Sequence, residues 1–267
     1  MRGQPRILIN TPDVELWPGG LLRARSNADA RVLSRAGHVL RRKRDGRYLA
    51  AALPEGMLSL SPRWAHEPGV EAALDALDSL RTDRGFDIDA SGELPLEQLI
   101  ERLHFLGLDE SYGEQVGLGL VPEPAALAFA GFDRYRRPLW LTARAARAWE
   151  GMRRVAGSEG IVLEAISGYR SHHYQLGIFE RKLARGQTVE QILTVNAAPG
   201  YSEHHSGNAL DIGTPGEAPA EESFEKTPAF DWLTAHAGDF GFDMSYPRDN
   251  PHGIVYEPWH WYFAASR

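Results

Sequence analysis

The sequence predicts an α+β protein in which strands and helices are mixed along the chain. Short runs of aliphatic and β-branched residues, such as those at 161–166 and 209–212, predict strands. Other stretches carry apolar residues at every third or fourth position, which predicts amphipathic helices. The length of 267 residues suits one large domain, or one domain preceded by a smaller unit.

Residues 1–105 are expected to form a separate α+β accessory unit of unknown role, and residues 106–267 a second domain. The first region contains a strand near residues 6–10, a hairpin around the basic cluster 41–44, and helices near 70–80 and 94–103. It shows no chemical motif. A stretch punctuated by glycine and proline, from Gly107 to Pro124, marks the expected boundary region.

Helix and strand signals alternate through the second region. Thr142 can cap a helix that runs to Arg154, and Ser171 can cap another that ends at Gly186. A short helix is expected at 189–193 and another at 230–237. Extended segments are expected at 161–166, 209–212, 242–246 and 259–263.

The composition excludes several classes of function. A formal net charge of −7 argues against binding to nucleic acid, and the basic cluster 41–44 fits a solvated hairpin face better than a phosphate-binding patch. No segment approaches the ~20 apolar residues that span a bilayer. The N-terminus lacks the apolar core of a secretory signal, so the chain is expected to be cytosolic or, alternatively, an envelope protein whose leader has been removed.

The absence of cysteine limits any metal site to His, Asp and Glu ligands. His204 precedes Asp211 by seven residues, with Gly207 allowing a sharp turn between them. With His260, these side chains would supply the three ligands of a catalytic Zn²⁺ site, one ion per chain, and leave a fourth position open. The prediction requires the two imidazoles to lie within ~5 Å of each other.

Two further side chains complete the predicted chemistry. Glu257 lies three residues before His260 and can act as the general base, provided that Pro258 and Trp259 bend the chain. Arg170 follows a strand and offers donors to an oxygen that gains charge. Each motif alone also fits a structural role, because a histidine near a glycine is often a hydrogen-bonded core residue and Glu257-Pro-Trp-His260 can form a buried turn.

Four motifs in fixed order resemble the zinc D-alanyl-D-alanine carboxypeptidases of the vancomycin-resistance (VanY) type, which share a fold with lysostaphin-like endopeptidases and hedgehog domains. The resemblance covers roughly residues 120–263. The residues that carry it are Ser167-Gly-Tyr-Arg-Ser with Gln175, Pro199-Gly-Tyr-Ser-Glu-His-His-Ser-Gly-Asn-Ala-Leu-Asp-Ile212, Phe240-Gly-Phe with Tyr246-Pro247, and Gly253-Ile-Val-Tyr-Glu-Pro-Trp-His260.

The resemblance implies a central antiparallel sheet with flanking helices, and it implies roles for individual residues. His204, Asp211 and His260 match the zinc ligands, Glu257 the base and Arg170 the cation of the transition state. Ser202, Gln175 and Tyr169 match the substrate side. The chain departs from the family at Ser245 and Tyr262, where members often have arginine, and this can change which peptide tail is accepted.

Four other histidines lie near these motifs. Register against Asp211 favours His204 over His205 as the ligand and leaves His205 facing solvent or behind the metal. His172 and His173 are expected on a helix surface at the rim of the cleft, with a substrate contact as the alternative. His252 is expected in a loop.

The implied activity is hydrolysis of the terminal D-Ala-D-Ala bond of peptidoglycan stem peptides by water that Glu257 activates. L,D-carboxypeptidase and endopeptidase activities remain alternatives, because they differ in pocket shape and not in catalytic groups. A zinc-stabilised cell-wall-binding module of the same fold is the alternative without catalysis. The presence of both Glu257 and Arg170 favours the enzyme.

Overall fold

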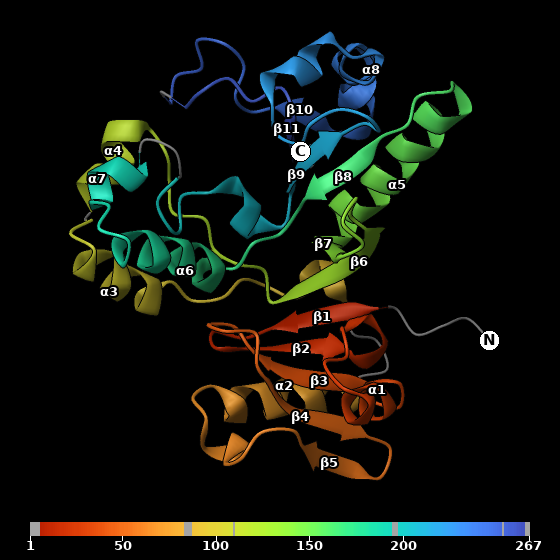
Figure 1. Cartoon of the computed structure of the whole chain (residues 1–267), viewed down its shortest axis with the longest axis vertical. Helices are drawn as coiled ribbons and strands as arrows, with labels where there is room; N and C mark the ends of the chain where they lie inside the picture. Colours follow the sequence, from red (N-terminus) through yellow and green to blue (C-terminus); the bar gives the residue numbers. More distant parts are fainter. Residues whose placement is uncertain (1–5, 83–86, 109, 194–196, 253, 265–267) are drawn as a thin grey trace. The chain divides into compact units, whose positions relative to one another are not determined.

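The computed structural model describes residues 6–82, 87–108, 110–193, 197–252 and 254–264. The chain packs as two compact units: the first comprises residues up to Pro95 together with Pro124–Ala128, and the second comprises Leu96–Glu123 and Phe129–Arg267. In Figure 1 the first unit runs from red to orange, and the second contains the green and blue elements. The assignment of an accessory role to one region and a catalytic role to the other stays a prediction.

The division does not fall at the expected boundary near residue 105. Helix α3 (Glu97–Phe105) belongs to the second unit because its buried Leu99 and Leu103 pack against Ala198 and Tyr201. A helix follows the core that buries its apolar face, and the local sequence pattern does not reveal which core that is.

The first unit is built on an antiparallel sheet with the strand order β5-β4-β3-β2-β1, which the first residues of β6 extend. Helix α2 covers one face with Val70, Ala73 and Leu77, and α1 places Leu33 in a second core cluster with Val39 of β3. The elements of the first unit are β1 (Ile7–Asn10), β2 (Val14–Pro18), α1 (Asn27–Leu33), β3 (His38–Arg42), β4 (Tyr48–Leu53), β5 (Gly56–Ser59) and α2 (Val70–Thr82), followed by the start of β6 (Ala126–Phe132).

The expected hairpin around the basic cluster forms from β3 and β4. Arg42 and Lys43 are buried, however, so the expectation of a solvated face is wrong for these two residues. Arg42 pairs with Asp45 at 2.5 Å and with Glu67 at 2.6 Å. Its charge is therefore compensated inside the unit, as a buried charge requires.

The second unit contains a four-stranded sheet with the order β10-β11-β9-β8, and every pair is antiparallel. This confirms the predicted α+β class with a central antiparallel sheet. Strand β7 is a neighbour of β6. The elements are α3, α4 (Glu110–Val116), β7 (Pro138–Leu141), α5 (Ala143–Ser158), β8 (Glu164–Ser167), α6 (His172–Leu183), α7 (Val189–Leu193), β9 (Ala209–Gly213), α8 (Pro228–His236), β10 (Phe242–Met244) and β11 (His260–Phe263).

The predicted helix starts in this unit are confirmed. The Thr142 side chain accepts a hydrogen bond from the backbone N–H of Ala145, and Ser171 accepts one from that of Tyr174. Strand β8 begins later than expected, because β9 ends at Gly213, opposite Glu164, and the pairing between the two strands stops there. Among the described residues, no helix is both long and apolar enough to span a bilayer.

Candidate active site

Two strands and one turn bring the predicted metal ligands together. Asp211 of β9 lies directly opposite His260 of β11, so both side chains project from the same face of the sheet. His204 comes from the 3₁₀ turn Glu203–Ser206 (η4), which leads into β9. Gly207 ends that turn at φ +70°, a left-handed conformation that glycine adopts readily, and so makes the sharp turn that the sequence predicted.

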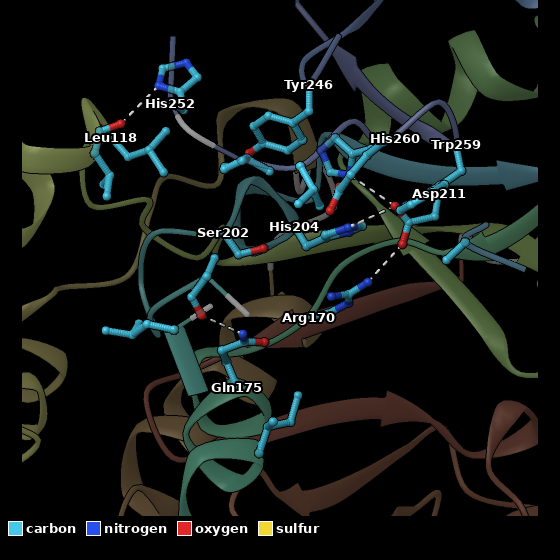
Figure 2. A pocket seen from close by; sticks show the side chains of 18 of the residues that line it. Leu118, Arg170, Gln175, Ser202, His204, Asp211, Tyr246, His252, Trp259 and His260 are labelled. Atoms are coloured by element: carbon cyan, nitrogen blue, oxygen red, sulfur yellow. Dashed lines mark hydrogen bonds and ion pairs between the residues drawn. The ribbon is translucent and has the colours of Figure 1, made fainter. Parts of the chain in front are cut away.

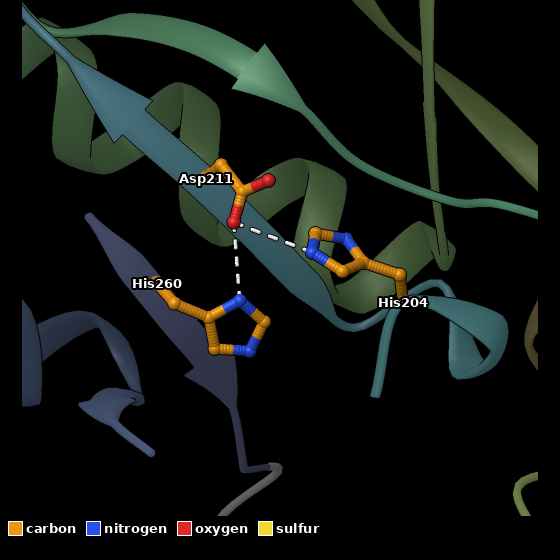
Figure 3. Close-up of side chains that lie close together, drawn as sticks. All are labelled: His204, Asp211 and His260. Carbon is orange, nitrogen blue, oxygen red and sulfur yellow. Dashed lines mark hydrogen bonds and ion pairs between the residues drawn. The ribbon is translucent and has the colours of Figure 1, made fainter. Parts of the chain in front are cut away.

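The donor atoms of His204, Asp211 and His260 all lie within 4.8 Å of one another, and all three residues are buried (Figure 3). The Oδ1 atom of Asp211 is 3.3 Å from Nε2 of His204 and 3.1 Å from Nδ1 of His260. A tetrahedral ion with ligands at ~2.0–2.1 Å separates its donors by ~3.3 Å. The ring centroids are 4.9 Å apart, within the limit that the sequence analysis set.

Each of these three side chains is held by a second contact on its far side. The other ring nitrogen of His204, Nδ1, lies 2.8 Å from the carbonyl of Gly168, and the other nitrogen of His260 lies 2.8 Å from Glu203. The second oxygen of Asp211 accepts a hydrogen bond from Arg170 at 2.9 Å. These contacts turn Nε2 of one ring and Nδ1 of the other toward a common point, as metal-binding histidines require.

The protonation states follow from burial and from these contacts. Burial and the charge of Arg170 lower the pKa of His204 to about 4, which keeps the ring neutral. Burial also opposes charge on His260, but hydrogen bonds to Asp211 and Glu203 outweigh it and raise the pKa to about 9. Although burial disfavours its charge, Asp211 has a pKa well below the usual range because of the neighbouring histidines and Arg170.

Glu257 reaches the cluster through the predicted bend. Pro258 and Trp259 form a turn that a hydrogen bond from the N–H of His260 to the carbonyl of Glu257 closes at 3.1 Å. The Glu257 carboxylate lies 3.9 Å from Nδ1 of His260, on the side of the ring that faces Asp211. Burial raises the pKa of Glu257, which would suit the predicted role as a general base near neutral pH.

The cluster opens into a cavity of about 370 Å³ (Figure 2). Ser202 and Gln175 line it, as the resemblance implies, but Tyr169 is not among the lining residues. The Tyr169 hydroxyl instead donates a hydrogen bond to Glu123. The further lining residues are Tyr112, Val116, Leu118, Arg170, Ile178, Leu193, Ala197, His204, Asp211, Ala220, Tyr246, His252, Ile254, Val255, Glu257, Trp259 and His260.

Two further histidines are buried. For His205 this excludes the solvent-facing one of the two predicted positions; its Nδ1 lies 2.7 Å from the carbonyl of Arg170, and burial lowers its pKa to about 3. His172 is also buried, so the expected surface position is wrong. Its ring lies 4.5 Å from that of His205, and its Nδ1 lies 3.2 Å from Glu123. His173 is half-buried on α6.

Sequence reasoning missed both carboxylates that support the site. Glu203 adjoins His204 and could have been noticed as a carboxylate inside the histidine motif. Glu123 had no such signal, since it lies 49 residues before His172 and precedes the motifs. His252 lies in a turn, as predicted, and its ring nitrogen is 3.3 Å from the carbonyl of Val116. Gly253 of the last motif lies outside the described residues.

Comparison with known proteins gives three related findings. The bifunctional D-Ala-D-Ala dipeptidase and carboxypeptidase VanXYC of Enterococcus gallinarum is 30% identical over 148 residues, which are 54% of this chain and 76% of that protein. YodJ of Bacillus subtilis (strain 168) is 32% identical over 141 residues, 51% of this chain and 50% of that protein. The solved structure of the LD-carboxypeptidase LdcB is 32% identical with a TM-score of 0.44, covering 46% of this chain and 59% of that one.

This chain therefore spans about half the length of YodJ and somewhat more of LdcB. The family model described as VanY, D-alanyl-D-alanine carboxypeptidase, matches residues 138–266, which include Arg170, Glu257 and the clustered His204, Asp211 and His260. With the alignment over most of VanXYC, this match shows that the chain belongs to the VanY family of D-alanyl-D-alanine carboxypeptidases.

Proposed function

We propose that this chain is a zinc-dependent carboxypeptidase that removes the terminal D-alanine from peptidoglycan stem peptides. The observation that carries the proposal is the buried His204, Asp211 and His260 cluster at the cavity, with Glu257 beside it. The substrate class is supported by the D-Ala-D-Ala activities for which the relative VanXYC is named.

The donor set fits zinc. Two imidazole nitrogens and one carboxylate oxygen form a three-ligand catalytic site, and each imidazole has its second nitrogen held by an acceptor. Zinc bound by these side chains would polarise the scissile carbonyl and make a water molecule more acidic.

Two residues of the chain carry out proton transfer and stabilisation of charge. Glu257 accepts a proton from the attacking water and returns it to the leaving amine of D-alanine, so that one water is consumed and two products form. Arg170 lines the cavity and can donate hydrogen bonds to the carbonyl oxygen as that atom gains charge. Its position is fixed by Asp211 at 2.9 Å and by the Ser167 hydroxyl at 3.1 Å.

Ser202 and Gln175 supply polar contacts for the peptide. Gln175 is buried; its amide nitrogen donates to the carbonyl of Ala197 at 2.9 Å, while its side-chain oxygen has no hydrogen-bond partner among the described residues. Both residues line the cavity, which supports this assignment.

Mass spectrometry of stem peptides incubated with zinc-loaded protein tests the proposal. We expect a pentapeptide ending in D-Ala-D-Ala to lose one alanine, while a tetrapeptide and a cross-linked dimer remain intact. Loss of alanine only from the tetrapeptide would assign L,D-carboxypeptidase activity, and cleavage only of the dimer would assign endopeptidase activity. Protein that binds zinc and cleaves none of the three would support the non-catalytic binding module instead.

A further inference from the structure

A carboxylate lies behind one of the clustered histidines. The Oε2 atom of Glu203 is 2.8 Å from Nε2 of His260 and accepts a hydrogen bond from the Ser245 hydroxyl at 2.6 Å. The Glu203 side chain is 25% exposed, whereas the His260 side chain is 3% exposed. The contact is therefore largely shielded from water. A charge-assisted hydrogen bond is stronger in such a shielded place than at the surface.

We propose that Glu203 is a positioning residue of the metal centre. It accepts the Nε2–H of His260, fixes that tautomer and the ring orientation, and so presents the Nδ1 lone pair to the metal. The inference rests on the zinc site of the proposed function, and it assigns Glu203 a task distinct from that of Glu257.

The two sides of the His260 ring separate these tasks. Nδ1 faces Asp211 at 3.1 Å and Glu257 at 3.9 Å, so the metal and the base belong to this side. Nε2 faces Glu203, which is not among the residues that line the cavity. Glu203 therefore contacts the far side of a ligand and not the reacting atoms.

The local fold explains why this carboxylate is in place. Glu203 and His204 are consecutive residues of η4, so one turn supplies a ligand to the cluster and an acceptor to the ligand that β11 contributes. The Ser245 hydroxyl donates to the same Oε2 atom and restrains the carboxylate. For His204 the equivalent acceptor is the main-chain carbonyl of Gly168. A charged acceptor makes the imidazole a more basic ligand than a neutral carbonyl does.

Zinc affinity, measured by competition with a chromophoric chelator, tests the proposal. Glu203→Met removes the acceptor at similar size, and we expect about 10–100-fold weaker zinc binding. Glu203→Gln retains an acceptor oxygen, so its affinity should fall between those of Glu203→Met and the wild type. Glu222→Gln is the matched control, because Glu222 is 62% exposed and pairs only loosely with Arg248 at 3.6 Å; it should bind zinc as the wild type does.

The wild-type protein provides a second measurement that does not depend on a variant folding. In ¹⁵N NMR spectra of the zinc-loaded protein, Nε2 of His260 should carry the proton, and the chemical shift of Nδ1 should be that of a metal-bound nitrogen. Folding of each metal-free variant is checked by circular dichroism before its affinity is compared. In cobalt-loaded protein, Glu203→Met should also shift the visible absorption bands, because the orientation of one ligand changes.

Two results would overturn the inference: folded Glu203→Met that binds zinc as tightly as the wild type, or zinc-loaded wild type with the proton on Nδ1 of His260. Neither measurement uses hydrolysis. If the wild type binds zinc but cleaves no stem peptide, the proposed activity is contradicted. The zinc affinities of the variants still test the role of Glu203 in that case. Wild type that binds no zinc contradicts the metal centre itself.

Discussion

The two units of this protein both bury charged side chains, but they satisfy them in different ways. In the first unit, Glu15 is 3% exposed and its carboxylate accepts hydrogen bonds from Arg41 at 2.6 Å and from Trp17 at 2.7 Å. In the second unit, the buried His204, Asp211 and His260 turn their donor atoms toward one another. The first arrangement pairs an anion with a cation, whereas the second brings three electron-pair donor atoms close together.

The difference shows that burial of a polar group does not by itself mark a functional site. A buried ion pair is complete, because each charge has its partner within the fold. A cluster of electron-pair donors is completed by a cation. The direction of the donor atoms, and not their burial, therefore distinguishes the candidate site from the structural network of the first unit.

Substitution of the proposed base should give the largest effect. Glu257→Gln is expected to lower kcat by about 10²–10⁴-fold with zinc content unchanged, because the amide cannot take the proton from water. Release of D-alanine and metal content in the same preparation measure both quantities. Hydrolysis close to the wild-type rate would contradict the assignment of Glu257 as base.

Arg170→Lys should lower kcat by about 10²–10³-fold, since a lysine keeps the charge but loses the fork of donors. The guanidinium contacts Asp211 and Ser167 through different nitrogens, which one ammonium group cannot reproduce. Steady-state kinetics on the pentapeptide give the effect. An unchanged kcat with a raised KM would instead assign Arg170 to substrate binding alone.

A matched pair of substitutions sharpens the comparison between the units. Glu15→Gln and Glu123→Gln each remove a buried charge that accepts hydrogen bonds, and each should lower the free energy of unfolding by about 1–3 kcal/mol. Only Glu123→Gln should also lower kcat/KM. Glu123 holds the turn that carries Arg170, through the Tyr169 hydroxyl and the backbone N–H of His172.

Chemical denaturation and kinetics on the two variants separate these effects. Equal loss of kcat/KM in both folded variants would show that the activity responds to general stability and not to the support of Arg170. Tyr169→Phe removes one hydroxyl from the same network and should have a smaller effect in the same direction.

The last effect concerns the acid stability of the metal-free protein and leaves activity aside. The folded-state pKa values of His204 and His205 are about 4 and about 3, below the unfolded value of ~6.5. As the pH falls below ~6.5, these histidines therefore take up protons in the unfolded chain before they do so in the folded protein. The free energy of unfolding decreases with falling pH until the pH is below the folded-state pKa values. His205→Gln should reduce the slope of the free energy of unfolding against pH by about 1.4 kcal/mol per pH unit between roughly pH 6 and 4. Denaturation curves that keep the full slope would contradict the neutral, buried state of His205.

Most of the local structure could be predicted from the sequence, because its causes are local. Thr142 and Ser171 cap helices through backbone groups three residues away, and α7 matches its predicted bounds of 189–193. The prediction failed where a distant partner decides. Strand β8 is shorter than its apolar run because β9 ends first, and α3 packs with the second unit and not the first.

The sequence by itself determined the donor types of the candidate site and the turns that carry them. Without cysteine, only His, Asp and Glu were available, and Gly207 and Pro258 set the local bends. Only the tertiary structure decided that His260 lies opposite Asp211 and that Glu203 and Glu123 support the site. The physical reason is that strand register and burial depend on the packing of segments far apart in the chain, for which no single segment carries the signal.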